Sequence, residues 1–312
     1  MELDNQTFQT EFLLLGLSEP GPWQAVLFPV CFCIYLAGLV GNLLLVFLVI
    51  TDSHLDTPMY FFLGNFSFLE ICFTSVTVPR LLANTLASMK AISLPGCLLQ
   101  VYFLHSMGCT ECFLLAIMAF DRYLAIHRPL HYSTVMTRRL CVTLAATTWI
   151  ACLLYSSLHS VILSQLSFCR RSQEIHHYFC DIPALLQAAC SDVSLGKSVL
   201  HVAGTVVVVC PFAWTLLSYV LILAAILHIR SAQGRAKAFS TCTSHLTMVL
   251  LFYGTVSIAY VRPQRSCCSE MDRLVSLLYT IVTPTLNPVV YSLRNKEVKG
   301  ALKSLLSRAD RS

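Results

Sequence analysis

The chain has 312 residues, of which 56% are hydrophobic and only 12% are charged, and its mean hydropathy is +0.69. A soluble globular domain carries roughly 25% charged residues, so this chain lacks the charge that a water-facing surface needs. The formal net charge of +5 could favour nucleic acid, but 13 of the 21 lysines and arginines lie in three short segments, 122–139, 230–237 and 294–311. This distribution indicates the cytoplasmic side of a membrane protein rather than a nucleic-acid-binding surface.

Seven long apolar segments predict seven membrane-spanning helices, because a helix needs about 20 consecutive apolar residues to cross a bilayer. The first contains no charged side chain, whereas the second and third carry a carboxylate well inside the apolar run, Glu70 and Glu111 respectively. The sixth is the weakest, because its polar start, residues 239–245, is stable in a membrane only when packed against neighbouring helices. The predicted fold class is an all-α bundle of seven transmembrane helices, over residues 24–50, 58–80, 95–121, 140–163, 196–229, 238–261 and 271–292.

The charge distribution also sets the orientation. With the N-terminus outside, the cytoplasmic segments hold the 13 clustered basic residues, as the positive-inside rule requires. Residues 1–23 are then extracellular, residues 24–292 form the transmembrane domain and residues 293–312 are a cytoplasmic tail. Asn5 in Asn5-Gln6-Thr7 matches a glycosylation acceptor on the outer side.

The two ends of the chain carry further signals. The N-terminal segment contains no lysine or arginine and does not resemble a cleavable signal peptide, so the first span is expected to act as an uncleaved anchor. In the tail, Asn295 to Leu306 alternates lysine with apolar residues, which predicts a short amphipathic helix on the inner leaflet.

The 15 cysteines divide into two groups. Most lie inside apolar runs, where a free cysteine acts as a small hydrophobic side chain. Four lie at or between apolar runs, which favours disulfides on an oxidising side: Cys97, Cys169, Cys180 and Cys190. Their spacing alone permits three connectivities.

Five motifs follow one another along the chain. They are Gly41-Asn42, the segment 57–63 (TPMYFFL), the segment 118–132 (MAFDRYLAIHRPLHY), the segment 237–247 (KAFSTCTSHLT) followed by Phe252-Tyr253-Gly254-Thr255, and the segment 284–295 (PTLNPVVYSLRN). Together they resemble the odorant receptors, a branch of the rhodopsin-like G-protein-coupled receptors. The spacing of the outer cysteines is similar to that of the tetrapod-type class II branch. Three positions depart from the family pattern: Phe120 replaces a usual Tyr, Glu70 a frequent Asp, and His127 a common Cys.

The resemblance implies a function. We expect a small, neutral, mainly hydrophobic odorant to bind among the third, fifth, sixth and seventh helices and to activate a stimulatory heterotrimeric G protein of the olfactory type, raising cyclic AMP. It also implies disulfides Cys97–Cys180 and Cys169–Cys190, and a place in the plasma membrane of olfactory neuron cilia. Leu104 stands where amine-binding relatives have an acid. The residues expected to contact the ligand are His105, Gly108, Cys109, Cys112, Val202, Val206, Tyr253, Thr255, Ile258, Ala259, Tyr279 and Thr280.

The cytoplasmic half carries the expected switch. Arg122 needs a partner at the membrane edge, and Asp121 beside it is the obvious one, although a plain interfacial ion pair is the alternative. Pro288 removes a backbone hydrogen bond and permits a kink, which suits a bistable element. By resemblance, the coupling residues are Asp121, Arg122, Tyr123, Tyr219, Lys237, Asn287, Pro288 and Tyr291.

Glu70 and Glu111 are the most informative pair of acids within the spans, and two carboxylates near the middle of the bilayer are costly unless protonated, hydrogen-bonded or neutralised by a cation. The preferred interpretation is a shared sodium or calcium ion, and the alternative is two protonated acids that stabilise helix packing. No other cofactor is predicted.

His105, Cys109 and Cys112 lie on one face of the third helix, at i, i+4 and i+7. Copper or zinc could bind such a stripe, but it lacks an evident fourth ligand, and a pocket wall is the preferred interpretation.

Two other functional classes are disfavoured. A transporter is expected to show inverted repeats, and a membrane enzyme needs a nucleophile paired with an oriented base. We find neither pattern, so the chain is predicted not to be an enzyme.

Overall fold

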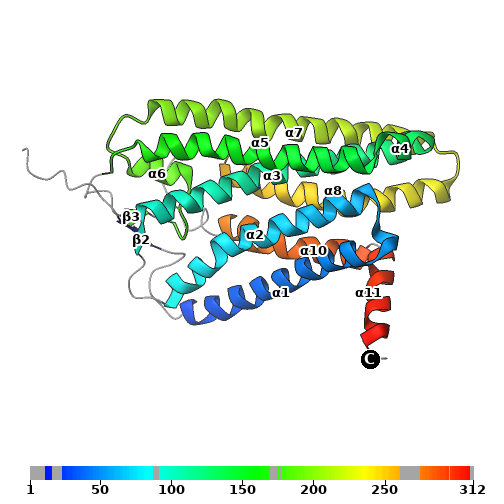
Figure 1. Cartoon of the computed structure of the whole chain (residues 1–312), viewed down its shortest axis with the longest axis horizontal. Coiled ribbons are helices and arrows are strands. Elements are labelled where there is room, and N and C mark those ends of the chain that lie inside the picture. The colour runs from blue at the N-terminus through cyan, green and yellow to red at the C-terminus, as the bar shows by residue number, and fades with distance from the viewer. Residues whose placement is uncertain are drawn as a thin grey trace, which may run out of the picture.

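The computed structural model describes residues 11–15, 23–86, 91–168, 174–175, 177–260, 275–294 and 296–309. Long helices lie side by side along the longest axis of the molecule (Figure 1). They are α1 (Trp23–Thr51), α2 (Pro58–Leu86), α3 (Leu94–His127), α5 (Arg138–Ser164), α7 (Ser194–His228), α8 (Ala232–Tyr260) and the helix formed by the π-turn η3 (Leu278–Val282) with α10 (Thr283–Arg294).

The apolar character of these helices matches the predicted spans. Five helices within the described ranges are long and apolar enough to cross a membrane: Val26–Thr51, Pro58–Leu86, Leu94–His127, Arg138–Ser164 and Ser194–His228. The sixth, α8, has 29 residues and therefore sufficient length, but its first turns are polar, as the sequence indicated. The seventh contains the shorter apolar stretch Val275–Val290.

Short elements occupy the two ends of the bundle. At one end lie η1 (Ser53–Leu55), α4 (Pro129–Val135) and α11 (Lys296–Ala309), and α11 turns away from the bundle axis (Figure 1). The apolar face of α11 packs inward through Val298 and Ala301, which confirms the predicted amphipathic helix. The hydroxyl of Tyr60 on α2 donates a 2.6 Å hydrogen bond to Glu297 of α11.

The opposite end contains a small sheet that the sequence did not predict. Strand β1 (Glu11–Leu14) pairs antiparallel with β2 (Ala91–Ser93) and parallel with β3 (Glu174–Ile175), and α6 (Ile182–Ala188) lies beside them. These strands have only two to four residues, too few for a period-two pattern to stand out in the sequence. Asn5 lies outside the described residues.

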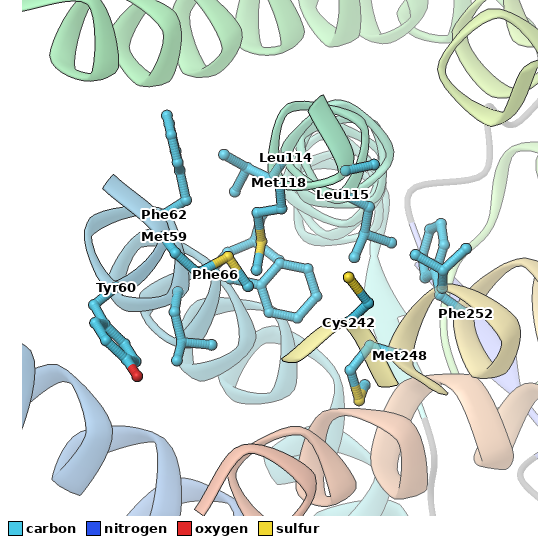
Figure 2. Close-up of a cluster of buried hydrophobic side chains, with 14 of the residues drawn as sticks. Met59, Tyr60, Phe62, Phe66, Leu114, Leu115, Met118, Cys242, Met248 and Phe252 are labelled. Atoms are coloured by element: carbon cyan, nitrogen blue, oxygen red, sulfur yellow. The ribbon is translucent and has the colours of Figure 1, made fainter. Parts of the chain in front are cut away.

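The largest buried cluster joins α2, α3 and α8 in the cytoplasmic half of the bundle. Figure 2 shows Phe62 and Phe66 of α2 facing Leu114 and Met118 of α3, with side chains of α8 completing the layer. Because lipid is as apolar as these side chains, close packing rather than burial from water holds such helices together.

Glycines allow α1 and α10 to approach closely. A Cβ atom at Gly38 would lie 2.5 Å from Thr285 Oγ1, and one at Gly41 would lie 2.9 Å from Pro288 Cγ. Close approach brings polar groups into reach, and Thr285 Oγ1 donates a 3.2 Å hydrogen bond to the carbonyl of Ile34. Small residues at a transmembrane interface permit this kind of contact.

Asn42 supplies a hydrogen bond to a backbone carbonyl that Pro288 leaves without a helical partner. Proline has no N–H group, so the carbonyl four residues earlier, that of Pro284, loses its helical partner. Asn42 Nδ2 donates a 3.2 Å hydrogen bond to that carbonyl, and a second of 3.0 Å to Gly38. The Gly41-Asn42 motif of the first helix and the Pro288 motif of the seventh therefore form one structural unit.

A disulfide closes the outer end of the bundle. Cys97 at the start of α3 is bonded to Cys180, with 5.5 Å between their Cα atoms, which confirms the first predicted pairing. Gln100, one turn further along α3, accepts a hydrogen bond from the Cys180 amide at 2.9 Å and donates one to the Val76 carbonyl of α2 at 3.1 Å. Cys190 is also disulfide-bonded, but Cys169 lies outside the described residues, so the second pairing stays a prediction.

Replacing Cys97 or Cys180 with serine should reduce delivery to the cell surface to near background, because a native disulfide contributes about 2–5 kcal/mol to a folded domain. Surface staining of intact cells, normalised to total receptor, measures the effect. Cys33→Ser is the matched control, since Cys33 is a free and exposed cysteine of α1. Normal staining of either disulfide variant would contradict the importance of this bond.

Candidate functional site

The outer half of the bundle brings α3, α7 and α8 together around Tyr253. The Tyr253 ring lies 4.7 Å from the Phe212 ring of α7, and its hydroxyl donates a 3.4 Å hydrogen bond to the Cys112 carbonyl of α3. Cys109 and Cys112 are both buried on this side of α3. Three helices that the sequence assigned to the ligand cavity thus meet at one aromatic side chain.

The outer loop inserts a side chain into the bundle. Tyr178 is fully buried, and its hydroxyl lies 2.8 Å from Thr280 Oγ1 in the π-turn η3. His177 Nε2 lies 3.2 Å from Ser276 Oγ one turn earlier. Because Cys180 ties the same segment to α3, residues 177–180 connect α3 to the seventh helix across the outer end. The sequence did not single out either aromatic residue, since loop residues carry no helical period.

His105 belongs to a polar cluster between α3 and α5. Its ring lies 5.1 Å from the Tyr155 ring and 4.6 Å from the His159 ring, and those two rings lie 4.7 Å apart. One atom of each side chain, namely His105 Nδ1, Tyr155 Oη and His159 Nε2, is buried without a hydrogen-bond partner among the described residues. Buried polar atoms are normally paired, so this cluster has hydrogen-bonding capacity to offer a ligand.

Tyr155 and His159 were missed at the sequence level. Both lie on α5, four residues apart. This i, i+4 spacing is the feature of the sequence that could have identified them. The resemblance had instead directed attention to helices three, five, six and seven.

The structure corrects the predicted contribution of α7. Val202 and Val206 are 69% and 55% exposed on the outer surface of the bundle, so their placement does not fit a cavity wall. The neighbouring positions Ala203, Gly204 and Val207 are partly buried instead. Because α7 is apolar on every side, its hydropathy pattern does not distinguish the inward face from the lipid-facing one.

Four of the remaining predicted ligand contacts are described by the structure, and the side chains of two others are not. Thr280 is buried, Thr255 and Tyr279 are partly buried, and a Cβ atom at Gly108 would meet nothing within 4 Å. The side chains of Ile258 and Ala259 lie outside the described part of the structure.

At the cytoplasmic end of α3, Asp121 and Arg122 form the predicted ion pair. Arg122 Nη2 and Nε donate hydrogen bonds of 2.6 and 3.1 Å to Asp121 Oδ2, and Asp121 is fully buried. The other oxygen, Oδ1, accepts a 2.6 Å hydrogen bond from Tyr132 of α4. Burial, with the Asp121 carboxylate next, raises the pKa of Tyr132 above its usual range, which keeps the phenol protonated and able to donate.

A second buried contact joins α7 to α8 nearby. Tyr219 Oη lies 2.7 Å from His245 Nδ1, and both side chains are buried. Tyr123 is partly buried and stacks on His127, with 5.2 Å between ring centroids. The side chains of Lys237 and Tyr291 lie outside the described part of the structure.

His245 and Tyr132 were not assigned roles at the sequence level. Each lies inside a motif quoted for the family resemblance, 237–247 for His245 and 118–132 for Tyr132. The motifs were the signal, but they did not say which neighbours these side chains contact.

Glu70 and Glu111 are buried near each other. Glu70 is fully buried and Glu111 is 5% exposed, and the Glu111 carboxyl lies within electrostatic range of Glu70. Asn287 Nδ2 donates a hydrogen bond to Glu70 Oε1. Glu70 Oε2 and Asn287 Oδ1 are buried without hydrogen-bond partners among the described residues. Helices α2, α3 and α10 therefore converge on a group of oxygen atoms.

Within the described ranges, no group of three or more histidine, cysteine, aspartate or glutamate side chains is placed to hold a metal ion. The copper or zinc alternative for His105, Cys109 and Cys112 consequently gains no support, and the pocket-wall interpretation is retained.

Comparison with known proteins decides the family. A family model described as olfactory receptor matches residues 30–309 of the chain. The chain belongs to the olfactory receptor family. It is 48% identical to human olfactory receptor 10Q1, over 97% of this chain and 95% of that protein. It is also 47% identical to rat olfactory receptor 1f45 over 98% of both chains, and 46% identical to mouse olfactory receptor 1E16 over 97% and 96%.

These findings confirm the resemblance seen in the motifs. The chain is a multi-pass membrane receptor with a seven-helix bundle, and it is not an enzyme.

The hydrogen bond from Tyr132 to Asp121 predicts a constraint on receptor activity. Tyr132→Phe should raise basal nucleotide exchange several-fold. A hydrogen bond to a charged group contributes about 1.5–3 kcal/mol, and loss of this one weakens the arrangement in which Asp121 is paired with Arg122. Exchange on purified G protein without odorant measures the effect. Ser133→Ala, at an exposed position of the same short helix, is the matched control. Equal basal exchange in the two variants would contradict the role of Tyr132.

Proposed function

We propose that this olfactory receptor binds a small, neutral, mainly hydrophobic odorant and activates a stimulatory heterotrimeric G protein, which raises cyclic AMP. The observation that carries the proposal is the pairing of Asp121 with Arg122 at the cytoplasmic end of the same helix, α3, whose outer half contacts Tyr253 and the outer loop. One rigid helix thus extends from the proposed ligand site to the proposed coupling site.

The chemistry of the outer half supports the choice of ligand. Its walls combine apolar and aromatic side chains with the polar cluster of His105, Tyr155 and His159. Leu104, which stands where an acid would attract an amine, offers no charge. Mostly apolar walls with a few polar groups suit a small hydrophobic molecule that carries one hydrogen-bonding group.

The proposed response is a shift between two arrangements of the helices. An odorant can favour one arrangement only through a difference in its affinity for the two. In the arrangement described here, Asp121 accepts hydrogen bonds from the Arg122 side chain, and Tyr132 donates a further hydrogen bond to Asp121. An odorant that binds more tightly when this pairing is open would release Arg122 toward the G protein.

The test is a panel of neutral odorants applied to cells that express the receptor, read out as cyclic AMP. Arg122→Ala should abolish the response to any active odorant while surface expression stays close to wild type, because the mutation removes the charge without touching the outer half. A full odorant response in a surface-matched Arg122→Ala receptor would contradict the proposal. Arg139→Ala, at an exposed arginine of the same cytoplasmic side, is the control.

The buried acids suggest a second component of the function, a bound sodium or calcium ion. Two carboxylates and an amide oxygen are the hard oxygen ligands that such cations prefer, and Glu70 Oε2 and Asn287 Oδ1 have no other partner among the described residues. Glu70, Glu111 and Asn287 would hold the ion. Sodium would offset one of the two carboxylate charges that are costly inside a membrane, and calcium would offset both. The alternative, two protonated acids, requires no ion.

Glu111→Gln separates the two possibilities, because glutamine keeps the size and hydrogen-bonding groups of a neutral acid but loses the charge. If the acids share a cation, the variant should change basal activity or odorant response and lose sensitivity to sodium or calcium. Dose–response curves at varied cation concentration and constant ionic strength provide the measurement. A wild-type receptor with no cation dependence would rule out the ion and leave the packing role.

A further inference from the structure

A small, partly open cavity of about 70 Å³ lies in the seam between α7 and α8, in the cytoplasmic half of the bundle. Its lining follows a helical stripe on both sides, at i, i+3, i+4 and i+7 counted from Tyr219 on α7 and from Phe239 on α8. The two helices thus face each other with matching stripes, yet they leave space between them.

The walls of this cavity behave as apolar, because the two hydroxyl groups in its lining are already hydrogen-bonded. The Tyr219 hydroxyl is already bonded to His245, and the Thr243 hydroxyl donates a 2.8 Å hydrogen bond to the Phe239 carbonyl of its own helix. The other lining side chains are hydrophobic. A space with no free polar group favours a hydrocarbon occupant over water.

The seam borders the lipid-facing surface. Leu223 on α7 and Phe239 on α8 both line it, and they are 48% and 49% exposed. In a bilayer, exposed side chains on the outside of the bundle contact lipid. Because van der Waals packing rather than burial from water holds transmembrane helices together, an unfilled seam forfeits contacts that a lipid chain would restore.

Two arginines lie at the cytoplasmic end of the seam. Arg235 stands one turn before Phe239 on the same face of α8, and Arg230 follows the end of α7, four residues after Ile226. Arg235 donates a 3.0 Å hydrogen bond to the Ile229 carbonyl. Neither arginine forms an ion pair with a carboxylate in the described ranges. The mouth of an apolar seam therefore carries two positive charges, and no described carboxylate pairs with either of them.

We propose that this seam is a binding site for an anionic phospholipid, with part of an acyl chain in the gap between α7 and α8 and the headgroup at Arg230 and Arg235. The charge at the mouth selects among lipids, because the inner leaflet contains anionic phosphatidylserine and each nearby basic residue attracts it. The bound chain lies against Tyr219, so the site adjoins the Tyr219–His245 contact. This proposal concerns lipid binding and does not depend on the identity of the odorant or of the G protein.

The experiment uses the full-length receptor in phosphatidylcholine nanodiscs that contain a small fraction of a photoreactive lipid. The probe carries a diazirine on its acyl chain and has either a phosphatidylserine or a phosphatidylcholine headgroup. Labelled peptides are mapped by mass spectrometry after irradiation. The phosphatidylserine probe should label the seam residues of α7 and α8 several-fold more than the phosphatidylcholine probe, and more than it labels Val40, a 62% exposed residue of α1.

Two variants test the parts of the site separately. Thr243→Phe fills the cavity and should remove labelling of the seam while labelling at Val40 stays unchanged. Arg230→Gln with Arg235→Gln should reduce phosphatidylserine labelling several-fold, to the phosphatidylcholine level. The control for net charge is Arg138→Gln with Arg139→Gln, which alters two exposed arginines at the start of α5.

Equal labelling by the two headgroups, or seam labelling no higher than at Val40, would overturn the proposal. Persistence of seam labelling in Thr243→Phe would also overturn it. The arginine variants lie outside the packed core, so they test the site even if the larger side chain at position 243 impairs folding.

Discussion

Inside a bilayer no water is available to polar groups, so every carbonyl, amide and carboxylate in the bundle needs a partner within the protein. The junction of α1, α2 and α10 shows how this constraint organises the receptor. Pro288 leaves the Pro284 carbonyl without a helical partner, and Asn42 supplies one. Asn287, the residue immediately before Pro288, reaches across to Glu70. The glycines of α1 are required because these contacts need the helices close together.

The same constraint explains why the buried charges lie where helices meet. Asp121 is fully buried at the cytoplasmic edge, and it uses both carboxylate oxygens, one for Arg122 and one for Tyr132. Glu70 and Glu111 lie at the convergence of α2, α3 and α10. A contact between helices can be exchanged for another when the helices move, whereas a backbone hydrogen bond within a helix is retained. Polar contacts of this kind therefore suit a protein that changes between two packed arrangements.

The outer end is held differently from the cytoplasmic end. A disulfide, the bridging side chain of Gln100 and the buried ring of Tyr178 fix the outer loop to α3 and to the seventh helix. The cytoplasmic end has no disulfide in the described ranges and depends on hydrogen bonds of Asp121, Tyr132, Tyr219 and Glu297. A covalently fixed outer end and a hydrogen-bonded inner end suit a receptor in which ligand contacts are preorganised and the coupling surface can rearrange.

The sequence by itself determined the membrane class, the spans, the short amphipathic helix and the family resemblance, because long apolar runs, charge bias and contiguous motifs are local properties of the chain. The Cys97–Cys180 pairing came from that resemblance, since the cysteine spacing alone left three connectivities open. It also placed Glu70, Glu111, Asp121 and Arg122 correctly in buried or interfacial positions, since charges at membrane depth stand out against apolar neighbours. Only the tertiary structure decided which side chains meet: Asn42 with Pro284, Tyr132 with Asp121, Tyr219 with His245, and His105 with Tyr155 and His159. It also turned Val202 and Val206 outward. In water the polar face of a helix reveals its inward face, but lipid and protein interior are equally apolar, so the rotation of a transmembrane helix is set by packing against its neighbours and is only weakly encoded in its own hydropathy pattern.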